Sequence, residues 1–139
     1  LKTKSFKALK GQLPWPADGR IIAKFGRQWN SKLKTTTENP GIDIKGQPGS
    51  PIRTVLGGVV TTITYIRGYG TTIIVDHGGG FYTVYSHVTN IQTVVDGQVR
   101  NGDIIAYMGD SGSINGSKLH FEIWGKGQKL DPEKWLIKK

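Results

Sequence analysis

Cysteine is absent from this 139-residue chain, which excludes a disulfide scaffold, a thiolate zinc site and a cysteine nucleophile. Long apolar runs are also absent, since none approaches the roughly 20 residues that span a bilayer. Membrane contact is therefore expected only through segments upstream of this sequence. Acidic residues are scarce: ten Asp and Glu stand against 19 Lys and Arg, a net charge of +9. Such a surplus attracts polyanions, including nucleic acid, acidic lipid, anionic cell-wall polymer or an acidic protein face.

The positive charge is spread over the two ends of the chain rather than gathered in one stripe. No basic-aromatic module or recognition-helix pattern accompanies it, so nucleic acid is not an expected partner. The terminal lysines that carry much of the surplus are Lys2, Lys4, Lys7, Lys10, Lys126, Lys129, Lys134, Lys138 and Lys139.

Twenty glycines and six prolines, together with many Val, Ile, Thr and Tyr residues, favour short strands joined by tight turns. We therefore predict an all-β fold of antiparallel sheets. Residues 1–12 have helix-forming composition ended by a glycine, which indicates the end of an upstream helix or a linker. Residues 13–139 are expected to form one monomeric domain. The predicted strands are 20–25, 41–44, 51–56, 59–66, 71–76, 81–87 and 118–124.

Alternation along two of these strands places reactive side chains on defined faces. In 81–87 it puts Tyr85 and His87 on the same face, and in 118–124 it puts Lys118, His120 and Glu122 on one face. The third histidine, His77, precedes a run of glycines and is expected only to complete a turn or to bond the backbone.

Two histidines and a carboxylate inside a short strand suggest convergence on one groove. Asp43 lies between two isoleucines, and its side chain together with His87 and His120 could face a shared site.

Three separated motifs resemble the lysostaphin/LytM family of zinc endopeptidases that cut peptidoglycan cross-bridges. They are Asn39-Pro40-Gly41-Ile42-Asp43-Ile44, Tyr85-Ser86-His87 and Lys118-Leu119-His120-Phe121-Glu122-Ile123, in the family's order and spacing. The resemblance extends over roughly residues 13–136. It implies a partly open barrel-sandwich with a central groove.

The resemblance also implies roles for single positions. Asp43 and His120 match two of the family's zinc ligands, while Asn39 stands where the third ligand, a histidine, is expected. His87 matches one catalytic histidine, and Lys118 stands where the other is expected. The implied metal ligands are thus Asp43 and His120 alone, with His87 as a vestigial catalytic residue.

The two replacements predict weak zinc binding. A catalytic zinc normally takes three protein ligands and a water, and a neutral amide is a poor substitute for an imidazole. Without a firmly held metal, nothing lowers the pKa of the water toward about 7. An ammonium at Lys118 repels a cation and is not an evident base. We therefore expect no tightly bound cofactor, and zinc only if the domain is active.

A retained fold with a changed site resembles the LytM domains of the murein hydrolase activators of the NlpD and EnvC types. That resemblance implies a noncatalytic regulator of cell division or wall remodelling in the bacterial periplasm or cell envelope. Its partner would be a cell-wall amidase or peptidoglycan. The expected binding groove is formed by Asn39, Asp43, Tyr85, His87, Lys118 and His120.

Two alternatives remain open at this point. One is an active zinc metalloendopeptidase that cleaves peptidoglycan cross-links, with Asn39 or water completing the metal site and His87 acting as base. The other is a wall-targeting module whose positive charge holds an anionic polymer, in which case binding would vanish with salt.

Overall fold

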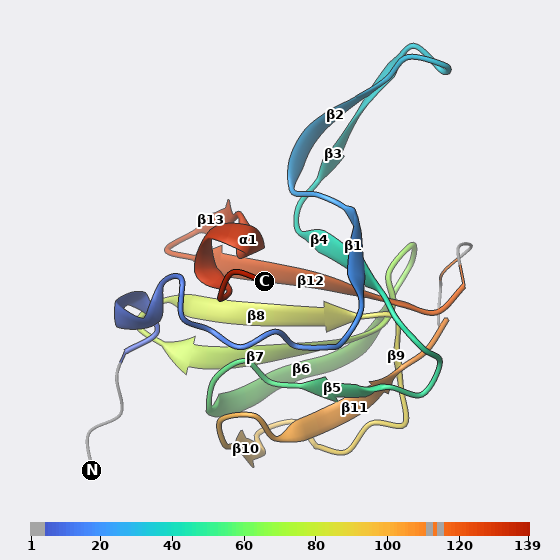
Figure 1. The fold of residues 1–139 in the computed structure, drawn as a ribbon. Helices are drawn as coiled ribbons and strands as arrows, with labels where there is room; N and C mark the ends of the chain where they lie inside the picture. Colours follow the sequence, from blue (N-terminus) through green and yellow to red (C-terminus); the bar gives the residue numbers. More distant parts are fainter. Residues whose placement is uncertain (1–4, 111–112, 114–115) are drawn as a thin grey trace.

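A computed structural model describes residues 5–110, 113 and 116–139 of the chain. The fold is almost entirely β, with antiparallel sheets that do not close into a barrel (Figure 1). The first half contains the 3-10 helix η1 (Lys7–Leu9) and strands β1 (Arg20–Ala23), β2 (Gly26–Asn30), β3 (Thr35–Asn39), β4 (Ile42–Lys45), β5 (Pro51–Arg53) and β6 (Gly58–Ile66). The second half contains β7 (Gly70–Gly78), β8 (Phe81–Ser86), β9 (Val88–Thr89), β10 (Gln98–Val99), β11 (Ile104–Met108), β12 (Lys118–Gly125), β13 (Gln128–Leu130) and helix α1 (Pro132–Trp135). In the described part, no helix is long and apolar enough to cross a bilayer.

The described strands form one large sheet and two small ones. The large sheet has eight strands in the order β1-β4-β12-β8-β7-β6-β10, with β13 paired to β12. A three-stranded sheet has the order β5-β11-β9. The two remaining strands, β2 and β3, form a hairpin that projects from the rest of the molecule (Figure 1). The predicted all-β class with antiparallel sheets is confirmed.

The large sheet has one face in the core and one face toward the candidate site. On β12 the side chains of Leu119, Phe121 and Ile123 are fully buried in the core cluster, as alternation predicts. They pack with the inward side chains of β7 and of the three-stranded sheet, which include Ile73 and Ile105. Burying such apolar surface is the main driving force for the fold. The opposite face of β12 is left for polar side chains.

The segment before residue 13 packs onto the domain. Phe6 is 2% exposed, and its ring lies 5.0 Å from that of Phe81 and 5.3 Å from that of Trp135. Helix η1 is a single turn, followed by Gly11, whose φ of 81° suits glycine. Residues 1–4 of the predicted upstream helix or linker lie outside the described residues. The core therefore includes a residue on the upstream side of the predicted boundary at 12–13.

Tyr85 does not line a groove, contrary to the sequence-based prediction. Its side chain is fully buried, and its ring lies 5.3 Å from that of Phe121. The hydroxyl accepts a hydrogen bond from the backbone N–H of Val55 at 3.1 Å and lies 2.8 Å from the Thr83 hydroxyl. Thr83 in turn contacts Nε2 of His77 at 2.7 Å. Tyr85 thus links β8 to the loop after β5 through the core.

Removing the Tyr85 hydroxyl should destabilise the fold. We predict that Tyr85→Phe lowers the free energy of unfolding by about 1–3 kcal/mol, because the Val55 N–H loses its acceptor in a buried site. Urea denaturation measures the change. The matched control is Tyr65→Phe, since Tyr65 is 67% exposed. Equal stability of the two variants would show that the hydroxyl network contributes nothing.

Candidate functional site

Five of the six predicted groove residues meet in one cavity of about 410 Å³. It lies where the base of the β2–β3 hairpin approaches the start of β12 and the turn between β6 and β7. The residues that line it are Ala23, Thr37, Glu38, Asn39, Pro40, Asp43, Gly68, Tyr69, His87, Lys118 and His120. The structure therefore brings Asn39, Asp43, His87, Lys118 and His120 together around one cavity.

Strand register explains why these side chains meet. In the antiparallel pair β4–β12, Asp43 lies directly opposite His120, and in the pair β12–β8, His120 lies opposite Ser86. Side chains directly opposite each other on antiparallel strands have Cβ atoms about 4.5–5.5 Å apart. Asp43 and His120 are therefore held within bonding distance by the backbone itself. Lys118 shares their face because it precedes His120 by two residues.

A chain of hydrogen bonds and ion pairs runs along this face. Oδ2 of Asp43 accepts a hydrogen bond from Nζ of Lys118 at 2.8 Å. Oδ1 of Asp43 lies 2.6 Å from Nδ1 of His120, and Nε2 of His120 lies 2.8 Å from Oε2 of Glu122. Trp124 donates from Nε1 to the other oxygen of Glu122 at 2.7 Å. Both ring nitrogens of His120 therefore face carboxylates.

The network is largely shielded from water. The exposed fractions of the side chains are 3% for His120, 7% for Glu122, 12% for Lys118 and 13% for Asp43. Buried charges are tolerated when they are paired and hydrogen-bonded, as all four are here. The ring of Tyr69 lies 4.9 Å from that of His120 and so also contacts the network.

Burial and pairing shift the pKa values in defined directions. Burial alone would raise the pKa of Asp43, but hydrogen bonds from His120 and Lys118 outweigh it and lower the pKa to about 2. Burial alone would lower the pKa of His120, but hydrogen bonds to Asp43 and Glu122 outweigh it and raise the pKa above 6.5. The pKa of Glu122 is lowered against the effect of burial by its bonds to His120 and Trp124. These directions favour an imidazolium between two carboxylates.

Sequence reasoning missed Glu122 as a site residue. Alternation had placed it on the same face as Lys118 and His120, which was the available signal. Its role depends on bonds to His120, Trp124 and Lys129, the last with Nζ 3.7 Å from Oε1 of Glu122. Tyr69 was also missed, because a tyrosine in a Gly-Tyr-Gly turn carries no signal of what it will contact.

His87 reaches the cavity by a route that alternation did not predict. It was expected on the face of Tyr85, but it follows the last residue of β8 and has a φ of 65°. The left-handed backbone rotates the chain direction at this point, so His87 lines the cavity while Tyr85 points into the core. The ring of His87 lies 6.4 Å from that of Tyr69.

Asn39 serves the local backbone. Its Oδ1 accepts a hydrogen bond from the N–H of Gly41 at 3.2 Å, an Asx-type turn that leads from β3 into β4. Gly41 is required there because a Cβ would lie 2.1 Å from the carbonyl oxygen of Phe121. The amide oxygen that replaces the expected imidazole is thus already engaged.

The donor set does not fit a catalytic zinc. Such a site needs three His, Cys, Asp or Glu ligands and an open position for water. Here His120 presents both nitrogens to carboxylates, and an ammonium occupies Oδ2 of Asp43. Within residues 5–110, 113 and 116–139, no group of three or more such side chains could hold a metal ion.

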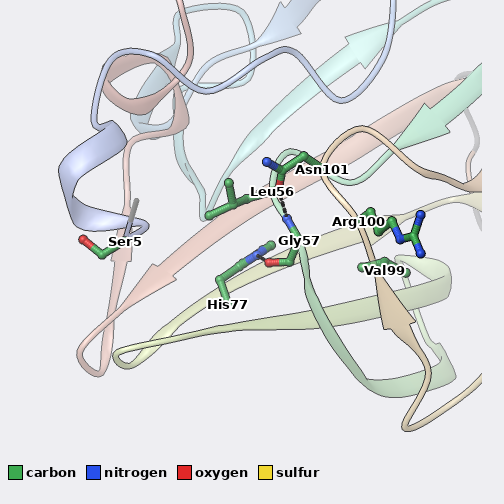
Figure 2. Close-up of a pocket in the computed structure, with 7 residues that line it drawn as sticks. All are labelled: Ser5, Leu56, Gly57, His77, Val99, Arg100 and Asn101. Carbon is green, nitrogen blue, oxygen red and sulfur yellow. Dashed lines mark hydrogen bonds between the residues drawn. The ribbon is translucent and has the colours of Figure 1, made fainter. Parts of the chain in front are cut away.

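A second cavity, of about 560 Å³, lies elsewhere on the molecule beside His77 (Figure 2). Nδ1 of His77 donates to the carbonyl of Gly57 at 2.9 Å, and Oδ1 of Asn101 accepts from the Gly57 N–H at 2.6 Å. Because Nε2 of His77 is also bonded, to Thr83, its ring has a structural role. The prediction that His77 bonds the backbone is confirmed.

His120 and His77 should respond to pH in opposite ways. The pKa of His120 is raised, so its stabilisation is complete below about pH 6.5 and is lost as pH rises through the folded pKa. In EDTA, the difference in unfolding free energy between the natural chain and His120→Gln should therefore shrink from pH 6 to pH 9, by roughly 1.4 kcal/mol per unit of pKa shift.

His77 provides the control of opposite sign. Burial lowers its pKa, so the natural chain loses stability as pH falls below about 6.5. The difference between the natural chain and His77→Gln should shrink toward acid. Denaturant unfolding across this range measures both series. A His120→Gln difference that stays constant above pH 6.5 contradicts the charged network.

The chain is similar in sequence to known proteins. Residues 37–132 match the model of peptidase family M23. The murein hydrolase activator EnvC of Escherichia coli is 31% identical over 135 residues, which cover 97% of this chain and 31% of that protein. The murein hydrolase activator NlpD of Salmonella typhimurium is 36% identical over 123 residues, which cover 88% of this chain and 30% of that protein. The chain thus spans about a third of the length of these relatives.

The fold is also shared with solved structures. A zinc containing peptidase from Vibrio cholerae matches with a TM-score of 0.81 at 22% identity, covering 93% of this chain and 41% of that one. At this identity the likeness concerns the fold. The family match, in contrast, extends over more than half of the sequence and includes Asp43, His87 and His120. The chain belongs to peptidase family M23.

Proposed function

We propose that this domain regulates peptidoglycan hydrolysis without catalysing it, by docking a cell-wall amidase at the cavity that contains Asp43, Lys118 and His120. The observation that carries the proposal is the engagement of both ring nitrogens of His120 by carboxylates. A histidine in that state has no lone pair to offer a metal. With Lys118 bonded to Asp43, the cavity presents a paired charge network instead of a Lewis acid.

The relatives support this direction. Proteins 31% and 36% identical to the chain are named murein hydrolase activators. That likeness supports the proposed role in the bacterial cell envelope, at division or during wall remodelling. The periplasm is the compartment in which such a domain would meet both an amidase and its substrate.

The cavity has features of a docking surface. Its rim combines the base of the β2–β3 hairpin, through Thr37 and Glu38, with Tyr69 from the turn between β6 and β7. Tyrosine is among the residues that most often dominate binding energy at protein interfaces. Tyr69 is the residue of this kind in the lining.

The second candidate function is zinc endopeptidase activity. The observation that favours it is the survival of Asp43, His87 and His120 within one cavity of an M23 fold. In this case zinc would be held by Asp43 and His120, and it would activate a water. The charged network would have to open before a metal could enter.

Metal content separates the two candidates. We predict that the chain, loaded with zinc and dialysed, retains far less than one equivalent, whereas Asn39→His/Lys118→His retains about one zinc ion per chain. The double variant supplies an imidazole where the amide stands and removes the ammonium from Asp43. Elemental analysis measures the ratio, and dye release from labelled sacculi measures cleavage. Stoichiometric zinc with dye release in the natural chain would establish the endopeptidase.

Amidase stimulation tests the regulatory role directly. We predict that the chain accelerates murein release by a purified cell-wall amidase from the same organism and that Lys118→Glu reduces this effect at least about tenfold, or roughly 1.4 kcal/mol. The variant places a third carboxylate beside Asp43 and Glu122 and so reverses the local charge.

The matched control for that experiment is Arg100→Glu, the same change of charge in the cavity beside His77. It should leave stimulation unchanged. Stimulation that falls equally in both variants would indicate a general effect of net charge. If the natural chain stimulates no amidase of the organism, the regulatory role is wrong.

A further inference from the structure

The site face of the large sheet continues beyond the cavity into a row of aromatic side chains. Tyr82 on β8 lies opposite Trp124 on β12, and Trp124 lies opposite Lys129 on β13. On the other side of Tyr82, its partner on β7 is Asp76. Opposed residues share a face, so two rings form a band with a carboxylate at one end and an ammonium at the other.

The two rings enclose a notch of about 270 Å³. Their centroids are 6.4 Å apart and their planes meet at 56°, so the walls form a V. The lining residues are Gly80, Tyr82, Trp124, Gly127, Gln128 and Lys129. Gly80 and Gly127 have φ of 86° and 83° and carry no side chain that could cover the rings. Both rings are half-buried, and part of each remains open to solvent.

Trp124 is held in place by the buried network. Its Nε1 donates to Oε1 of Glu122, whose side chain is 7% exposed. The indole therefore has its polar edge satisfied internally and its ring surface available to a ligand. Trp124 lies four positions after His120, about 13 Å along a strand at 3.3 Å per residue. The notch and the candidate docking cavity are thus separate places on one face.

We infer that this notch binds a sugar ring of a glycan strand. A pyranose has one face of C–H groups, which packs on aromatic rings, and a rim of hydroxyls, which bond to polar side chains. The notch offers both, because its lining combines two aromatic side chains with the polar side chains of Gln128 and Lys129. Its volume lies below the roughly 300–1,000 Å³ of most small-molecule sites, which suits a single ring.

The inference goes beyond the proposed regulatory function, because a glycan site would hold the domain on its polymer whether or not an amidase docks nearby. It also concerns different residues. Tyr82, Trp124 and Gln128 do not line the cavity that contains Asp43 and His120.

Titration calorimetry with tetra-N-acetylchitotetraose, a peptide-free glycan, tests the inference. The natural chain should bind the tetrasaccharide, and Trp124→Ala should weaken binding at least about tenfold by removing one wall. Trp29→Ala is the matched control, since it removes an indole that is 64% exposed on the β2–β3 hairpin. Its affinity should equal that of the natural chain.

Two further variants guard against a loss of folding, because Trp124 also bonds to Glu122. Tyr82→Ala removes the other wall and should weaken binding similarly, while Trp124→Phe keeps a ring and should retain part of the affinity. Circular dichroism establishes that each variant is folded. No heat of binding in the natural chain, or an affinity in both Trp124→Ala and Tyr82→Ala that equals the affinity of the natural chain, would overturn the inference.

The amidase assay on the same variants separates this inference from the proposed function. If Trp124→Ala lost both sugar binding and amidase stimulation, the notch and the docking cavity would act as one site. The natural chain could bind no sugar while Trp124→Ala loses amidase stimulation. That result would make the notch a contact for the protein partner, and the glycan site would be wrong. Sugar binding without any amidase stimulation would leave the glycan site standing and remove the regulatory role.

Discussion

The position of His120 between Asp43 and Glu122 is the contact on which the rest of the site depends. A charge buried to this extent is costly unless it is paired and its hydrogen bonds are satisfied. Here two cations, Lys118 and the imidazolium, face two carboxylates, so the four groups are neutral together. Removal of any one member leaves this group of four with a net charge in a largely buried place. The site is therefore coupled, and its residues cannot vary independently.

The same contact bears on how strands β4 and β12 are held together at the site. A divalent cation would hold a carboxylate on β4 and an imidazole on β12 by binding both. In this chain Lys118 provides positive charge at Asp43, and a short hydrogen bond joins Asp43 to His120. The strands are additionally held by four opposed residue pairs in the β4–β12 ladder. The backbone ladder thus pairs β4 with β12 over these four positions, in addition to the side-chain contacts at the site.

The alternation of side chains along a strand predicted the structure correctly where the backbone stays extended over the whole strand, as in β12. It placed Lys118, His120 and Glu122 on one face of their strand, and the residues that alternate with them, Leu119, Phe121 and Ile123, lie in the core. It failed at the end of β8, because a φ of 65° at His87 ends the alternation one residue after the strand. Nothing in Tyr85-Ser86-His87 signals that backbone angle. The contacts of Glu122 and Tyr69 also depend on which strands and turns become neighbours, which local pattern does not specify.

The division of the large sheet into two faces explains how function can change while the fold persists. Every odd-numbered residue of β12 from Leu119 to Ile123 belongs to the core, whereas the even-numbered residues from Lys118 to Trp124 carry the charged network and one wall of the aromatic notch. Substitution on the second face leaves the apolar packing of the first unchanged. A replacement such as lysine at 118 can therefore alter metal binding and docking at little cost to the core. Glu122 bonds to both His120 and Trp124. A substitution at either of these two residues therefore alters the hydrogen bonding of the carboxylate that also contacts the other.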